Sequence, residues 1–184
     1  MITPVVLAFS ARQGSGKSTI SAELAEELGW PRAGFGDYLR RVADERGLNT
    51  DREILQELGE RFVRDNLEQF CRNVLGSVGW VPGQGIVVDG IRHAQTMEVL
   101  RNIVRPMPVL LVYIDLPDAV RFDRLRARGV SETLAERNEQ HSTEAQVIDT
   151  LPRLADLRVD GRNTVAVIKA EIMASLRKRM DAQR

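Results

Sequence analysis

The chain has 184 residues, of which 43% are hydrophobic and 28% charged, as is typical of one globular domain with a sizeable core. Its 26 basic and 26 acidic side chains give a formal net charge of zero, which argues against nucleic acid as a partner. The single cysteine, Cys71, excludes an internal disulfide and a cysteine-based zinc site, so we expect a cytoplasmic protein.

Residues 5–20 contain an apolar run, a glycine-bearing turn and the start of a segment with helical spacing. The apolar run is too short for a signal peptide or a membrane span, so no membrane partner is expected. The turn has the pattern of a phosphate-binding loop (P-loop), and its candidate nucleotide-binding residues are Gly14, Ser15, Gly16, Lys17, Ser18 and Thr19. Backbone N–H groups of such a loop bind phosphate, Lys17 would reach the β- and γ-phosphates, and Ser18 would bind Mg²⁺.

Alanine stands at the first position of this P-loop, Ala11, where the pattern has glycine. A Cβ is tolerated there if φ is negative, so we expect phosphate binding to be retained. The alternative interpretation is a glycine- and serine-rich turn with Lys17 in solvent.

A helix with apolar spacing follows the P-loop and ends at Gly29. Residues 32–37 are predicted to form a second strand that ends at Asp37, with a helix from Tyr38. Because ligands bind at the carboxyl edge of parallel sheets, Asp37 is a candidate substrate contact. A role as the N-cap of the next helix is an alternative that is compatible with the first.

The segment 37–80 is predicted to be helical and to bind the second substrate. A break at residues 47–50 precedes a capping box formed by Thr50 and Glu53, so a new helix is expected there. Arg52 and Gln56 share one face of that helix, which is either a solvated surface or part of a binding site.

An apolar strand is predicted over residues 86–88, and it runs into Asp89. Asp89 is expected to hold Mg²⁺ through water, and Arg92 to point into the same cleft. The alternative is that Asp89 caps the next helix. His93 is interpreted as a surface residue.

The strand predicted at residues 109–116 is followed by an arginine-bearing helix. Arg121, Arg124 and Arg128 share one face, where a polyphosphate would offset their mutual repulsion; a solvated basic helix is the alternative. Residues 129–145 are predicted to form a short lid from which Arg137 reaches the transferring phosphate. Spacing assigns no role to His141 or Glu144. Thr164 is expected to cap a final helix.

These motifs resemble the P-loop kinases that phosphorylate nucleotides, and the resemblance covers essentially the whole chain. Residues 11–19, 89–92, 121–129 and 159–161 parallel the P-loop, the Asp-Gly-x-Arg segment, the lid arginines and the base-contacting loop of nucleoside monophosphate kinases. The resemblance implies a single α/β domain with a doubly wound, five-stranded parallel sheet of order 2-3-1-4-5, ATP and Mg²⁺ as cofactors, and Gly161 at the nucleotide base. Alternating strands and helices with right-handed crossovers independently favour this class.

Two segments resemble kinases with different acceptors, the acceptor being the molecule that receives the phosphoryl group. FGDYLR at 35–40 and LADLRVDG at 154–161 resemble dephospho-coenzyme A kinases and their uncharacterised archaeal relatives, in which the matching Asp37 is the base near the acceptor hydroxyl. TDREILQELG at 50–59 resembles phage-type deoxynucleoside monophosphate kinases. That likeness implies that Arg52 and Gln56 hold the acceptor nucleotide and that Arg40 contacts its phosphate.

The function expected is transfer of the γ-phosphoryl group of Mg·ATP to a nucleotide-like acceptor, most simply a nucleoside or deoxynucleoside monophosphate. Arg124, Arg128 and Arg137 would neutralise charge in the transition state, and Asp37 would orient the acceptor oxygen. Dephospho-coenzyme A kinase activity and a nucleotide-binding regulatory protein without catalysis are the alternatives. A GTPase is disfavoured because the sequence has no Asn-Lys-x-Asp segment. The sequence leaves monomer and homodimer open.

Overall fold

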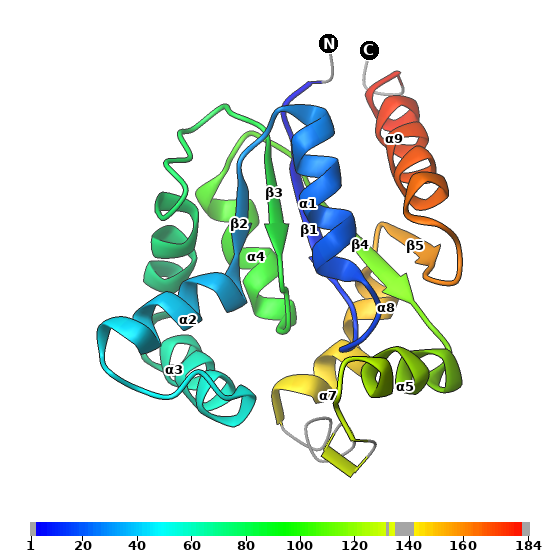
Figure 1. Cartoon of the computed structure of the whole chain (residues 1–184). Helices are drawn as coiled ribbons and strands as arrows, with labels where there is room; N and C mark the ends of the chain where they lie inside the picture. Colours follow the sequence, from blue (N-terminus) through cyan, green and yellow to red (C-terminus); the bar gives the residue numbers. More distant parts are fainter. Residues whose placement is uncertain (1–2, 132, 135–141, 182–184) are drawn as a thin grey trace.

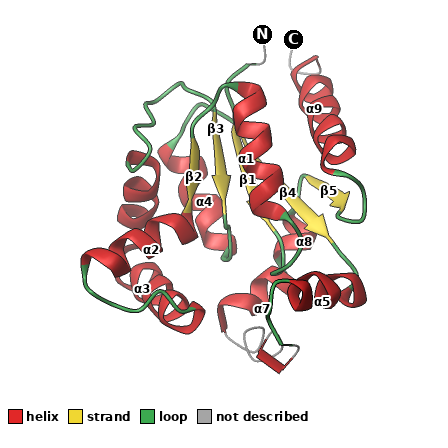
Figure 2. Cartoon of the chain, viewed as in Figure 1, coloured by secondary structure: helices red, strands yellow, loops and turns green. Residues whose placement is uncertain are grey.

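The computed structural model describes residues 3–131, 133–134 and 142–181. Five strands form one sheet, and helices lie on both of its sides (Figures 1 and 2). The strands are β1 (Val6–Ser10), β2 (Arg32–Gly34), β3 (Ile86–Asp89), β4 (Val109–Asp115) and β5 (Leu157–Asp160). The helices are α1 (Lys17–Leu28), α2 (Phe35–Glu45), α3 (Arg52–Gly76), α4 (Ala94–Ile103), α5 (Asp118–Ala127), α7 (Ser142–Ile148), α8 (Leu151–Leu154) and α9 (Val165–Asp181).

The sheet is parallel throughout, with the strand order β2-β3-β1-β4-β5, which confirms the predicted topology. The central strand β1 pairs with both β3 and β4, so that Val6 lies opposite Ile86 on one side and Val109 on the other. All residues of β1 and β3 are buried, as expected for apolar runs covered on both faces.

Alternating side chains of β1 belong to two separate hydrophobic clusters, one on each face of the sheet. Val6 and Ala8 pack with side chains of α2, α3, α4, α7 and α8. Leu7 and Phe9 pack with side chains of α1 and α9. The fold therefore buries the sheet between two helical layers and leaves the carboxyl ends of its strands available for a site.

The prediction of a second strand over residues 32–37 is wrong about its length. It ends at Gly34, and α2 begins at Phe35 rather than at Tyr38. Gly34 is the N-cap residue, which places Asp37 in the first turn of α2, where a carboxylate is favoured by the helix dipole. A Cβ on Gly34 would lie 2.2 Å from Oδ2 of Asp37, so the absence of a side chain at Gly34 lets the carboxylate fold back over the helix start.

The cap of α3 also differs from the prediction. Its N-cap residue is Asp51 rather than Thr50, and Asn49 hydrogen-bonds to Asp51 through its side chain. Inside α3 the backbone leaves helical geometry at Asn66, whose Oδ1 accepts a hydrogen bond from the Gln69 N–H at 2.9 Å and caps the second half. The predicted cap at Thr164 is confirmed by a bond from the N–H of Val167 to its Oγ1.

None of the helices in the described part of the chain is long and apolar enough to cross a membrane. The helices α2 and α3 occupy residues 35–76, close to the segment predicted for the second substrate. Within the segment 129–145 predicted as a lid, residue 132 and residues 135–141 lie outside the described residues, and Arg137 and His141 are among them.

Candidate active site

The loop between β1 and α1 has the backbone of a P-loop. Gly14 and Gly16 have φ angles of 86° and 85°, which side-chain-bearing residues rarely adopt. A Cβ on Gly14 would lie 3.0 Å from Cγ of Leu125 and 3.1 Å from the carbonyl oxygen of Arg121, so the loop is also closely packed there. Ala11 has no positive φ and is buried in the core, so its methyl group is accommodated as predicted.

The hydroxyl of Ser15 fits a phosphate site at this loop. Ser15 is 2% exposed, and its Oγ has no hydrogen-bond partner within the part of the chain that the structure describes. A buried hydroxyl without a partner is costly, and a phosphate oxygen would provide one. The loop also leads into the N-terminus of α1, whose backbone N–H groups and dipole attract an anion.

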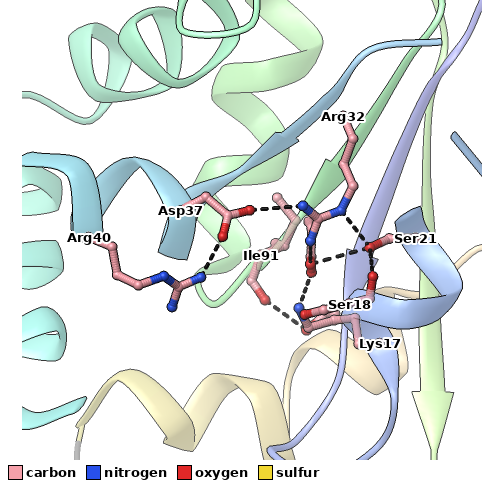
Figure 3. A network of polar contacts seen from close by, with 9 residues as sticks. Lys17, Ser18, Ser21, Arg32, Asp37, Arg40 and Ile91 are labelled. Atoms are coloured by element: carbon pink, nitrogen blue, oxygen red, sulfur yellow. Dashed lines mark hydrogen bonds and ion pairs between the residues drawn. The ribbon is translucent and has the colours of Figure 1, made fainter. Parts of the chain in front are cut away.

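A chain of ion pairs runs from the P-loop to α2 (Figure 3). Lys17 pairs with Oδ1 of Asp89, and Arg32 pairs with Oδ2 of the same carboxylate. Arg32 also donates from Nη1 to Asp37 at 2.8 Å, and Asp37 accepts a further bond from Arg40. Asp89 and Asp37, the two carboxylates in this series of ion pairs, therefore each lie between two cations.

These ion pairs, together with burial, shift the pKa values of Lys17, Asp37 and Asp89. Burial raises the pKa of Asp89, but the charges and hydrogen bonds of Lys17 and Arg32 outweigh burial, so its pKa lies below the ordinary value. The pKa of Asp37 is lowered in the same way, because hydrogen bonds from Arg40 and Arg32 outweigh burial. Burial lowers the pKa of Lys17, although Asp89 opposes the shift. Both carboxylates are therefore ionised at neutral pH.

The residues predicted to hold Mg²⁺ lie together, because the Ser18 side chain hydrogen-bonds to Asp89. No group of three or more His, Cys, Asp or Glu side chains arranged for a metal occurs among the described residues. The donor set therefore fits Mg²⁺ bound through Ser18, water and phosphate oxygens rather than an all-protein metal cage.

The three arginines predicted to face one polyphosphate, Arg121, Arg124 and Arg128, have different environments, and the prediction is wrong for Arg121. Arg121 is fully buried, pairs with Asp118 at 3.1 Å and lies over the Phe122 ring. Arg124 donates to the carbonyl oxygens of Ser15 and Gly161, at 3.3 and 2.9 Å. It thereby connects the P-loop to the loop after β5.

The predicted base-contacting residue, Gly161, follows β5 and lies outside the wall of the cavity described next. Its N–H donates to the Asp115 carbonyl oxygen at 2.7 Å, and a Cβ would lie 3.0 Å from that oxygen. This glycine therefore allows a close backbone approach between β4 and β5.

A cavity of about 410 Å³ extends from the P-loop to α2 and α3. One part of its wall is residues 11–19, and Asp89 and Arg128 also contribute. The part on the opposite side comes from α2, α3 and the β3–α4 loop. It contains every residue predicted to contact the second substrate: Asp37, Arg40, Arg52, Gln56 and Arg92. Apolar side chains complete the wall: Phe35, Leu39, Leu55, Val63 and Phe70.

Sequence reasoning missed three residues at this site. His93, interpreted as a surface residue, lines the cavity, and burial and the charge of Arg92 lower its pKa. Arg32 forms the centre of the ion-pair chain. Glu144 is 1% exposed and accepts hydrogen bonds from Arg52 and Gln56, at 2.6 and 3.3 Å, and from Arg92. Arg32 could have been recognised from the sequence, because it is a cation at the start of the strand that precedes Asp37. No local pattern marks Glu144.

The sequence of the chain is similar to a protein-family model and to proteins of archaea. The model of the AAA domain family matches residues 9–146. The UPF0200 protein PAE1629 of Pyrobaculum aerophilum is 32% identical over 127 residues, which cover 69% of this chain and 68% of the relative. A UPF0200 protein of Methanosarcina barkeri is 24% identical over 179 residues, which cover 93% of this chain and 94% of the relative.

Solved kinase structures have a similar fold. A gluconokinase from Sinorhizobium meliloti aligns with a TM-score of 0.65 and 18% identity, covering 100% of this chain and 97% of its own. Shikimate kinase from Aquifex aeolicus aligns with a TM-score of 0.64 and 18% identity, covering 96% of this chain and 98% of its own. The fold is thus that of small-molecule P-loop kinases, and the chain belongs to the AAA domain family and to the UPF0200 proteins.

Proposed function

We propose that the protein transfers the γ-phosphoryl group of ATP to a nucleoside or deoxynucleoside monophosphate. The observation that carries the proposal is that one cavity has the P-loop on one side and three arginines on the other, Arg40, Arg52 and Arg92. A phosphate donor and an anionic acceptor would therefore share one space, as in-line phosphoryl transfer requires.

The donor would be held by this chain's P-loop. Backbone N–H groups at the start of α1 and the Ser15 hydroxyl would bind phosphate oxygens, and Lys17 would add a charge. Arg128 lines the same cavity and would offset charge that develops during transfer. Mg²⁺ at Ser18, with Asp89 contacting it through water, would neutralise charge on the bound phosphates.

The state of Asp37 favours a phosphate acceptor over a hydroxyl acceptor. A hydroxyl must lose its proton to a base, whereas a phosphate oxygen is already ionised at neutral pH. The pKa of Asp37 lies below its ordinary value, because Arg40 and Arg32 donate to its two oxygens. Such a carboxylate is a weak base, so its role here is to orient Arg40 beside the acceptor.

The test is ADP release from Mg·ATP by the purified chain, with and without a panel of acceptors. The panel contains the nucleoside and deoxynucleoside monophosphates, dephospho-coenzyme A, gluconate and shikimate. Stimulation by a monophosphate is the expected result, and the Lys17→Ala variant should abolish it. Stimulation only by dephospho-coenzyme A or a sugar-like acid would reassign the acceptor to a hydroxyl. ATP binding without stimulation by any of them would favour a nucleotide-binding regulator instead.

A further inference from the structure

Glu144 is a buried acid at the acceptor side of the cavity. It lies on α7, and its Oε1 accepts from Arg52 and Gln56 of α3 and from Arg92 of the β3–α4 loop. Its side chain is 2% exposed, whereas those of Arg52 and Arg92 are 25% and 33% exposed. One carboxylate oxygen therefore joins three donors that come from two other parts of the chain.

Glu144 lies behind the cavity wall rather than in it. Arg52, Gln56 and Arg92 line the cavity, and Glu144 does not. A ligand in the cavity can therefore meet the two guanidinium groups without first meeting the carboxylate. A guanidinium has five N–H donors, so pairing with Glu144 does not exhaust the capacity of Arg92. Glu144 therefore does not compete with a ligand for the arginines, because a competing carboxylate would occupy the position of the ligand itself.

The two arginines repel each other. Burial, together with the charge of Arg52, lowers the pKa of Arg92 to about 9, so Arg92 is still a cation at neutral pH. Two partly buried like charges remain close more readily when an opposite charge offsets them. Glu144 supplies that charge from the side away from the cavity.

The helix α7 is fixed by contacts other than this ion pair. Oε1 of Gln146 accepts a hydrogen bond from the Ala94 N–H at 2.7 Å, at the start of α4. Val147 is 0% exposed and belongs to the hydrophobic cluster that contains Met97 and Leu100 of α4. The carboxylate of Glu144 is thus presented by an anchored element, so it can determine where the guanidinium groups stand.

We propose that Glu144 is a positioning residue that holds Arg52 and Arg92 side by side as a clamp for the phosphate of the acceptor. The proposal rests on the proposed function for the identity of the acceptor. The clamp itself is a property of the folded chain, so it can be measured without turnover.

The experiment is a calorimetric titration with inorganic phosphate in a Lys17→Ala background, which suppresses binding at the P-loop. Glu144→Gln should raise the Kd for phosphate about tenfold, which corresponds to about 1.4 kcal/mol. Glu144→Asp, which keeps the charge, should bind phosphate with a Kd between those of the parent and the glutamine variant. Glu57→Gln removes the same charge from an exposed position of α3 and should leave the Kd unchanged.

The direction in which the Kd for phosphate changes distinguishes a positioning role of Glu144 from a simple electrostatic effect. Removing a negative charge strengthens phosphate binding by simple electrostatics, so a lower or equal Kd for Glu144→Gln would overturn the positioning role. Absence of phosphate binding in the parent would also overturn it, while ADP release would judge the proposed function separately. If the glutamine variant does not fold, a folded Glu144→Asp variant that binds phosphate as tightly as the parent, or more tightly, refutes the proposal. In turnover assays, KM for the acceptor should rise while KM for ATP stays constant.

Discussion

Arg32 is the residue whose replacement tests the ion-pair chain most directly. Its guanidinium pairs with Asp89 on one side and Asp37 on the other, and its Nε donates to the Ser21 hydroxyl at 3.0 Å. Arg32→Gln removes the charge and leaves Asp89, which is 4% exposed, with Lys17 as its remaining cation. Asp37 keeps Arg40.

The expected loss of stability follows from burial. Breaking a fully buried ion pair costs about 3–5 kcal/mol. Arg32 is 23% exposed and Asp89 keeps a second cation, so we expect about 2 kcal/mol for this contact, near the value of a charged hydrogen bond. The contact with Asp37, which is 49% exposed, adds less than about 1 kcal/mol. A total of about 2–3 kcal/mol corresponds to a Tm lower by about 5–10 °C in a chain of this size.

The assay is urea denaturation of Arg32→Gln and wild type at several pH values. Because the folded-state pKa values of Asp37 and Asp89 lie below 3.8, the stability they contribute is complete above pH 3.8. It is lost as the pH falls through the lower folded-state values. The difference between wild type and variant should therefore be largest near pH 7 and shrink below about pH 3.8.

A surface pair provides the matched control. Arg41, on the same helix as Arg40, pairs with Glu45 at 3.7 Å, and both side chains are exposed. The Arg41 guanidinium also lies over the Tyr38 ring, so Arg41→Gln should change the free energy of unfolding by up to about 1 kcal/mol, still less than the loss expected for Arg32→Gln. The reasoning about Arg32 would be refuted by a loss no larger than that of this control, or by a loss that stays constant from pH 7 to pH 3.

Three further predictions concern single residues. Lys17→Ala should lower acceptor-dependent ADP release by about 10²-fold or more while circular dichroism stays unchanged, because Arg32 still pairs with Asp89; wild-type turnover would contradict the P-loop assignment. Gly14→Ala should lower stability by about 1–2 kcal/mol or more in thermal denaturation, because its φ is 86° and the new Cβ would crowd Leu125; an unchanged Tm would show that the loop relaxes freely. Cys71 is fully buried and burial raises its pKa to about 12, so thiol reagents should modify it at pH 8 only as the protein unfolds; reaction at the rate of a free thiol would contradict the packing of α3.

The sheet and the P-loop could be predicted because their signals are local. Apolar runs at residues 86–88 and 109–116 predict buried parallel strands, and β3 and β4 cover them to within one residue. Gly14 and Gly16 stand at the two positions that need a positive φ. In both cases, short stretches of sequence contain the physical reason for the structure.

The predicted boundary between β2 and α2 is wrong, because the local residue types there do not indicate where the helix begins. The residues RAGFGD contain two glycines and an aspartate, which are typical of a strand end or a turn. The structure starts the helix inside this stretch, at Phe35, whose ring packs against the aromatic side chains of α3 with its centroid 5.1 Å from that of Phe70. That partner is far along the chain, so local propensity could not indicate it.

Glu144 is the clearest case of a residue that sequence reasoning could not place. Its partners Arg52, Gln56 and Arg92 lie 92, 88 and 52 positions away. Spacing rules cover neighbours on one helix or strand, and none covers a contact formed when three elements meet at one end of a sheet. The arginines Arg52 and Arg92 of the cavity wall could be named from motifs, but the carboxylate that balances them depends on tertiary structure.

The zero net charge of the chain conceals a strong separation of charge. Eight side chains of the cavity wall are charged, and six of them are cations: Arg12, Lys17, Arg40, Arg52, Arg92 and Arg128, against Asp37 and Asp89. The remaining charges of the chain balance this excess, because the sequence has 26 basic and 26 acidic side chains. A concave wall with an excess of one sign concentrates its field inside the cavity. If the proposed function is correct, this charge excess inside one cavity is what would favour small phosphorylated ligands, while the molecule as a whole carries no net charge.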